Sequence, residues 1–101
     1  MSVSHHFNFG SKTLTIKVPE RFDFDCHQSI REIKDNIPPG AQFIVFDLSK
    51  TVYMDSAALG MLLVFRDKAV VHKQSITLSN VSPYVKKVLE VALFHTLFTI
   101  S

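Results

Sequence analysis

The sequence lacks paired cysteines, clustered charge and long apolar runs, and each absence excludes a class of protein. The single cysteine, Cys26, rules out an internal disulfide and favours a reducing compartment. No apolar run approaches the roughly 20 residues that a membrane-spanning helix needs, so we expect no membrane insertion. The chain also contains no repeat, linker or low-complexity segment, which leaves an ordinary folded domain.

Charge is sparse and mixed in sign. The formal net charge is only +2, and the basic residues are scattered without interleaved aromatics, which argues against a nucleic-acid partner. The residues from Met1 to His6 lack the basic-then-apolar layout of a signal peptide, so we expect a cytoplasmic protein. Hydrophobic residues at 47% and charged residues at 20% are typical of a globular chain, and 101 residues predict one domain over 1–101.

No arrangement typical of a catalytic or metal centre is present in the sequence. The five histidines and Cys26 show no metal-ligand spacing. Residues 10–13 imitate the end of a phosphate-binding loop, but the earlier glycine is missing and a strand follows in place of a helix. No Ser/His/Asp set or carboxylate pair indicates a hydrolase. We therefore expect no enzymatic activity, no cofactor and no metal ion.

The first third of the chain predicts a hairpin and a helix. Apolar and polar residues alternate over 6–9 and again over 13–18, and Gly10-Ser11 between them fits a hairpin turn. Asp25 then fits the N-cap of a helix, with Gln28 at the capping-box position. Two prolines and a glycine end this helix. Its apolar face is formed by Cys26, Ile30, Ile33 and Ile37.

The last third predicts two strands around a helix. Residues 75–79 alternate as a short strand, and Ser82 before Pro83 predicts a helix start. The buried stripe of that helix is Val85, Val88, Leu89 and Ala92. Residues 97–100 form a last strand. With the central elements described next, the order is β-β-α-β-α-β-α-β, an α/β fold whose mixed sheet has an antiparallel hairpin followed by parallel βα units.

The stretch from Phe43 to Val71 organises the rest of the chain. Residues 43–46 show no alternation and are too short for a helix, which favours a parallel strand covered on both faces. From Ser56 onward the apolar spacing becomes helical. The predicted core-facing sector is Leu59, Leu62, Leu63, Phe65, Ala69 and Val70. Arg66 also falls in this sector, with no explanation beyond a stem lying along apolar surface. Ser56 thus lies at the carboxyl end of a central strand, where open α/β sheets usually bind ligands and partners.

Three segments resemble the signature of the STAS domain, named after sulfate transporters and anti-sigma factor antagonists. They are Asp47-Leu48-Ser49, Met54-Asp55-Ser56, and Leu59-Gly60 before an apolar helix. The resemblance covers essentially the whole chain and implies a mixed sheet packed by helices. It differs at Ala57-Ala58, where the family often has Ser-Gly. Ser56 falls where the single-domain antagonists carry their phosphorylated serine or threonine.

The resemblance implies an anti-sigma factor antagonist in a bacterial partner-switching pathway. The unphosphorylated protein would bind an anti-sigma factor or a related serine kinase. The kinase would use ATP to phosphorylate Ser56 and so release the protein, and a serine phosphatase would reverse the change. The loop around Asp23 would lie near the phosphoserine and face the partner.

The residues alone give Ser56 a second explanation, because it or Asp55 could simply cap the helix. The same helix carries apolar side chains that point away from the core sector, on the side of Lys68 and His72. They are Ala57, Met61, Val64 and Val71. These side chains fit either a contact patch beside Ser56 or a second buried layer. The candidate partner contacts are therefore Asp23, Asp55, Ser56, Ala57, Met61, Val64 and Lys68.

Two further functions stay open at this point. The first is a small cytoplasmic STAS subunit of a membrane transporter, acting as a scaffold without cycling phosphate. The second is a phosphorelay receiver, in which Asp23, Asp25 and Asp55 form an acidic cluster and Asp55 is phosphorylated with Mg²⁺. The receiver is disfavoured because Asp25 is explained as a helix cap and no lysine stands at the end of the last strand.

Overall fold

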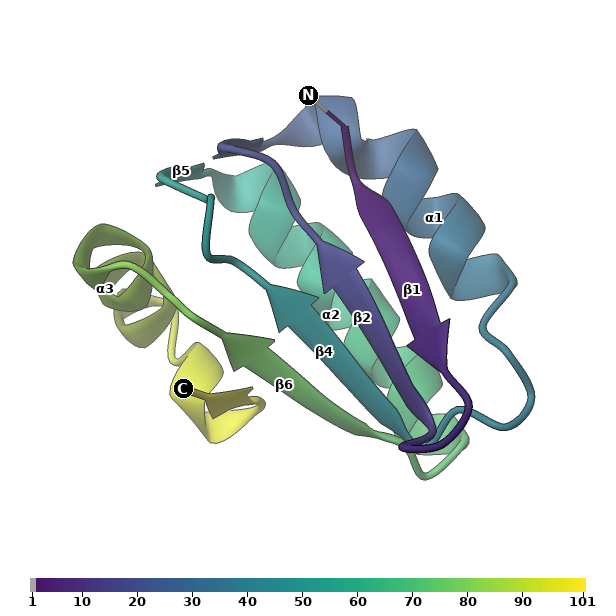
Figure 1. The fold of residues 1–101 in the computed structure, drawn as a ribbon. Helices are drawn as coiled ribbons and strands as arrows, with labels where there is room; N and C mark the ends of the chain where they lie inside the picture. The colour runs from purple at the N-terminus through teal and green to yellow at the C-terminus, as the bar shows by residue number, and fades with distance from the viewer. Residues whose placement is uncertain (1) are drawn as a thin grey trace.

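The computed structural model describes residues 2–101, which form a five-stranded sheet, a separate two-stranded sheet and three α-helices (Figure 1). The main sheet has the order β1-β2-β4-β6-β7. Its strands are β1 (Ser4–Asn8), β2 (Thr13–Lys17), β4 (Phe43–Asp47), β6 (Ser75–Ser79) and β7 (Thr99–Ile100). The α-helices are α1 (His27–Asp35), α2 (Ser56–Val71) and α3 (Pro83–Val91).

The topology confirms the predicted mixed sheet. β1 and β2 form an antiparallel hairpin in which His6 lies opposite Thr15. β4 is parallel to both β2 and β6, and β7 is parallel to β6. The carboxyl ends of the parallel strands and the start of α2 therefore meet at the same end of the molecule, at the top of Figure 1. This is the end at which Ser56 lies.

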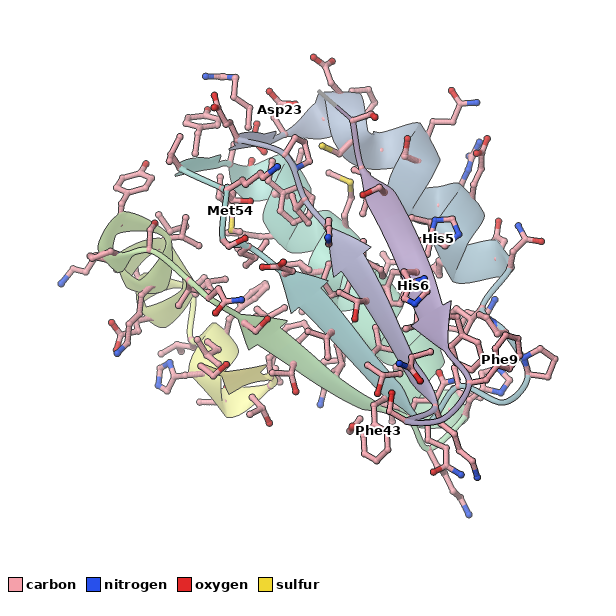
Figure 2. All side chains as sticks on the ribbon, in the orientation of Figure 1. His5, His6, Phe9, Asp23, Phe43 and Met54 are labelled. Carbon is pink, nitrogen blue, oxygen red and sulfur yellow. The ribbon has the colours of Figure 1, made fainter. Side chains whose placement is uncertain are left out.

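One face of the main sheet is covered and the other is open. In Figure 1, α1 and α2 lie behind the sheet, and within residues 2–101 no helix crosses the face turned to the viewer. Ile44 and Phe46 are buried, whereas Phe43 is 48% exposed. Figure 2 shows His6 and Phe43 on the open face. The prediction that residues 43–46 are covered on both faces is wrong, because α3 lies beside the sheet near β5 and not over its second face.

The first helix begins differently from the prediction. A short 3₁₀ turn, η1 (Phe24–Cys26), precedes α1. Its cap is Asp23, whose Oδ1 accepts a hydrogen bond from the Asp25 backbone N–H at 3.0 Å. Asp25 is therefore not the N-cap, since the 3₁₀ turn moves the start of the helical segment two residues toward the N-terminus. The predicted apolar face is confirmed at Cys26, Ile30 and Ile33, which are buried, whereas Ile37 lies beyond the end of α1 and is only partly buried.

The C-terminal strand is shorter than predicted. Only Thr99–Ile100 forms β7, because the preceding residues form a 3₁₀ turn, η2 (Phe94–Thr96). Phe94 and Phe98 stack at 5.3 Å and are both buried. The Arg66 Nε donates a hydrogen bond to the Leu97 carbonyl at 2.9 Å. This contact between α2 and the C-terminal segment explains why an arginine stands at position 66, which its place on the helix did not explain.

Asp47 joins two loops at the carboxyl end of the sheet. Its Oδ1 accepts hydrogen bonds from the Ser49 backbone N–H at 3.0 Å and from Asn80 Nδ2 at 3.1 Å. Partial burial acts to raise the pKa of Asp47, but the hydrogen bonds from Asn80 and Ser49, with Lys17 nearby, lower it below its ordinary value. The carboxylate therefore holds the β4 and β6 loops together in its ionised form.

Acid should weaken this junction. The lowered pKa means that ionised Asp47 stabilises the fold above its unfolded pKa of about 3.9, and that this contribution is lost as the pH falls through the folded pKa. Asp47→Asn, which cannot titrate, should lose less stability than the unmodified protein between about pH 5 and pH 2.5 in urea unfolding. Asp67→Asn, at an exposed position on α2, is the matched control. An identical acid response of Asp47→Asn and the unmodified protein would contradict this assignment.

Candidate functional site

A second, two-stranded sheet builds the end of the molecule around Ser56. Its strands are β3 (Arg21–Phe22) and β5 (Tyr53–Met54), which pair in parallel with Phe22 opposite Met54. Asp23 and Asp55 each follow one of these paired residues, so the two carboxylates are brought to the same edge. The Asp23 and Met54 labels lie at this end in Figure 2. Strands of two residues leave no periodic signal, so this sheet was not predicted.

Arg21 is held over this small sheet by two contacts. Its guanidinium carbon lies 4.2 Å from the centre of the Tyr53 ring, a cation–π geometry. Its Nε lies 3.4 Å from Asp23 Oδ2. Both contacts are exposed on the arginine side, so each is a modest source of stability. Together they link Tyr53 on β5 to Asp23 at the end of β3.

Asp55, and not Ser56, caps helix α2. The Asp55 backbone is extended, and its Oδ1 accepts a hydrogen bond from the Ala58 N–H at 3.1 Å. Ser56 is the first helical residue and is exposed. Among residues 2–101 its hydroxyl has no hydrogen-bond partner. Of the two caps that the sequence allowed, the structure uses Asp55, and the Ser56 side chain makes no cap hydrogen bond.

The buried Cys26 thiol is under the influence of three carboxylates at this end of the molecule. Burial raises the pKa of the Cys26 thiol, and the charges of Asp23, Asp25 and Asp55 raise it further against a backbone hydrogen bond that lowers it. The thiol is thus kept protonated and unreactive. The same effect means that each of the three carboxylates is within electrostatic reach of the Cys26 thiol. A phosphate on Ser56 would add negative charge to an end of the molecule that is already acidic.

The side of α2 turned to solvent is largely apolar, with Asp67 as an exposed charge. The buried residues of this helix are Ala58, Leu62, Phe65 and Ala69. On the opposite side, Leu63, Val64, Val70 and Val71 are 37% to 76% exposed. The prediction that Leu63 and Val70 face the core is wrong. The helix is apolar nearly all round, so its spacing alone did not define which side would be buried.

The predicted patch residues lie at a groove between α1 and α2. Ala57, Met61 and Val64 line one wall of this groove, and the exposed Val71 lies near the end of α2. Ala57 and Met61 are half-buried, so this surface is intermediate between a contact patch and a second buried layer. Lys68 has a structural contact as well, because its Nζ donates to the Lys34 carbonyl at 2.7 Å. This bond satisfies a carbonyl at the end of α1 with a cation.

Some residues at this groove were missed by the sequence reasoning. Phe24 is 66% exposed and stacks on His27 with ring centres 5.1 Å apart. Arg31 and Gly60 also line the groove. Phe24 alternates with Asp23 and Asp25, a pattern that reads as an inward apolar residue, and only the 3₁₀ turn brings it to the surface. The groove itself depends on how α1 meets α2, which no local pattern encodes.

The described residues carry two further negative findings. Within residues 2–101 no helix is both long enough and apolar enough to cross a lipid bilayer. In the same part of the chain, no three or more His, Cys, Asp or Glu side chains are grouped so as to hold a metal ion.

Comparison with known proteins identifies the family. The STAS domain matches residues 9–101. A STAS-domain containing protein of Pseudomonas aeruginosa (strain UCBPP-PA14) is 43% identical over 88 residues, covering 87% of each chain.

Solved structures share the fold at low sequence identity. The anti-sigma factor antagonist SpoIIAA in its unphosphorylated form is 18% identical with a TM-score of 0.72, over 99% of this chain and 87% of that one. The phosphorylated form of SpoIIAA from Bacillus is 19% identical with a TM-score of 0.69, over 99% of this chain and 91% of that one. A sulfate transporter family protein from Wolinella succinogenes is 15% identical with a TM-score of 0.78, over 84% of this chain and 70% of that one. Since the family match spans nearly the whole chain, the protein belongs to the STAS domain family.

Proposed function

We propose that this protein is an anti-sigma factor antagonist of a partner-switching pathway in the cytoplasm. Unphosphorylated, it binds an anti-sigma factor or a related serine kinase, and phosphorylation of Ser56 releases it. A serine phosphatase restores the binding form. The observation that carries the proposal is the exposed Ser56, without a hydrogen-bond partner among residues 2–101, at the start of a helix whose solvent side is largely apolar. The likeness to SpoIIAA, which is known in phosphorylated and unphosphorylated forms, supports it.

The local chemistry favours a phosphate that leaves the fold intact. Ser56 is the first residue of α2, where free backbone N–H groups and the helix dipole stabilise negative charge. This dipole effect is worth about 0.3–1 kcal/mol at a surface, whereas a nearly complete switch between two conformations needs about 5.5 kcal/mol. Phosphorylation therefore acts mainly on the interface and not by refolding the domain.

The interface supplies the larger energy. The phosphate adds about −1.5 to −2 charges next to the Asp55 carboxylate that caps the same helix. A partner that covers Ser56 and the apolar face of α2 would have to desolvate that charge, and an uncompensated charge in an interface costs several kcal/mol. The proposed contacts are Asp23, Asp55, Ser56, Ala57, Met61, Val64 and Lys68.

A second candidate function uses the same fold without phosphorylation of Ser56. The likeness to the Wolinella sulfate transporter family protein favours a STAS subunit that binds a transporter as a scaffold. In that case Ser56 would carry no phosphate in the cell, and the protein would co-purify with membranes. A receiver-type phosphorelay has less support, because the Asp55 carboxylate is used to cap α2. An acyl phosphate would also be cleaved by hydroxylamine, unlike phosphoserine.

Substitution of Ser56 tests the switch directly. Ser56→Ala should bind the kinase that phosphorylates Ser56 as tightly as the unmodified protein and should accept no phosphate at that position. Ser56→Glu should bind at least about tenfold more weakly, because it adds charge inside the interface. Isothermal titration measures the affinity of both variants for the kinase. Ser11→Glu, at an exposed hairpin position, should bind normally. Equal binding of Ser56→Glu and the unmodified protein would rule out the interface mechanism.

Stability measurements separate the roles of Asp55 and Ser56. Asp55→Ala removes the cap of α2 and should lower the free energy of unfolding by about 0.5–2 kcal/mol. Ser56→Ala removes a hydroxyl with no partner in residues 2–101 and should change it by less than about 0.5 kcal/mol. Urea unfolding at pH 7 measures both. A larger loss for Ser56→Ala than for Asp55→Ala would show that Ser56 is structural.

The apolar face of α2 can be tested without touching Ser56. Val64→Glu should weaken binding of the same kinase by about tenfold or more, because it introduces a charge into the proposed contact. Its side chain is 52% exposed, so stability should change little. Val91→Glu on α3, where valine is 73% exposed, is the matched control and should bind normally. Similar losses in both variants would mean that α2 is not the contact face.

A further inference from the structure

The groove between α1 and α2 has a largely apolar lining that nothing in the described chain covers. Its volume is about 430 Å³. Its apolar lining side chains are Phe24, Ile30, Ala57, Met61 and Val64. Phe24 leaves most of its ring in solvent at the end near Ser56. This shape fits an occupant that is apolar on one side and long enough to follow two helices.

The α1 edge of the groove is basic. His27, Arg31 and Lys34 recur at the helical spacing i, i+4, i+7 and all line the groove. Among residues 2–101 Arg31 has no ion-pair partner, and Lys34 has only a 3.8 Å contact with Asp35. Glu32 lines a different groove, on the β1 side of α1. Arg31 and Lys34 thus line the groove, Glu32 lies away from it, and Asp35 lies beside Lys34 at the end of α1.

Gly60 lies in the α2 wall of the groove without a structural need for glycine. It is inside a 16-residue helix, where glycine is less stable than alanine. A Cβ at this position would meet no atom within 4 Å. The free protein therefore has room for a side chain and would gain helix stability from it. The missing Cβ leaves space on the surface at which another backbone can approach closely.

We propose that this groove binds an amphipathic helix of the partner, with acidic residues along the edge that meets α1. The apolar stripe of that helix covers Met61 and Val64, its carboxylates face Arg31 and Lys34, and its backbone comes closest at Gly60. Helix-in-groove recognition uses anchors at i, i+3, i+4 and i+7, and small residues permit close helix contact. This inference rests on the proposed function, because it names the kind of segment with which the proposed partner binds.

A displayed library of 18-residue helical peptides tests this on the full-length, unphosphorylated protein. The enriched peptides should carry apolar anchors at helical spacing with Asp or Glu along one flank. Their affinities are then measured by fluorescence anisotropy. Arg31→Glu should weaken binding by about tenfold or more, since like charges then face each other. Lys87→Glu, the same charge change on α3, should leave the affinity unchanged.

Gly60→Ala supplies a test that a structural role could not mimic. It should raise the urea midpoint of the protein while weakening peptide binding by about tenfold or more, because the added Cβ blocks close approach. Enrichment of basic or non-helical peptides would overturn the proposal. So would binding that is lost in Glu32→Lys but kept in Arg31→Glu, or a stable dimer that buries the groove. Because the peptides bind without phosphate, a failure of the Ser56 switch would be seen separately.

Discussion

The packing of α2 against the covered face of the sheet is the constraint on which the rest of the structure depends. Ala58, Leu62, Phe65 and Ala69 are fully buried on one side of this helix, and the Phe65 ring meets Phe46 edge to face at 5.0 Å. Close packing of this kind fixes the rotation of the helix about its axis. Because the helix is apolar nearly all round, fixing one side also determines which apolar residues remain in solvent.

The junction before α2 divides two tasks between adjacent residues. Asp55 stabilises the helix by accepting the Ala58 N–H, which leaves Ser56 without a structural duty. A modification of Ser56 can therefore change the surface without removing the cap. The small β3–β5 sheet holds the Asp23 loop beside this junction. A negative group added to Ser56 would therefore lie at the end of the molecule that carries Asp23 and Asp55.

The open face of the main sheet shows how the helices are distributed. α1 and α2 share one side, and α3 with the C-terminal turn lies near β5 and β6. Crowding α1 beside α2 on a single face creates the groove that contains Gly60 and Arg31. The other face keeps threonine, histidine and a half-exposed Phe43, and needs no helix to cover it.

Local patterns in the sequence determined most of the fold and part of the site. The hairpin, the order of the long elements, the start of α2 at Asp55-Ser56 and the buried faces of α1 and α3 all follow from periodicity and cap residues, which act within a few positions. The resemblance of residues 47–60 to a STAS signature selected Ser56. The 3₁₀ turn at Phe24 and the β3–β5 pairing did not follow, because their signals are only two or three residues long.

Tertiary structure alone decided the rest. Which side of α2 is buried, which of Asp55 and Ser56 is the cap, and what Arg66 contacts each depend on residues far away in the chain. Leu63 and Val70 are exposed, against their apolar character, because the sheet takes up only one side of the helix. Sequence spacing specifies which residues share a face. Only packing against other elements specifies whether that face meets protein or water.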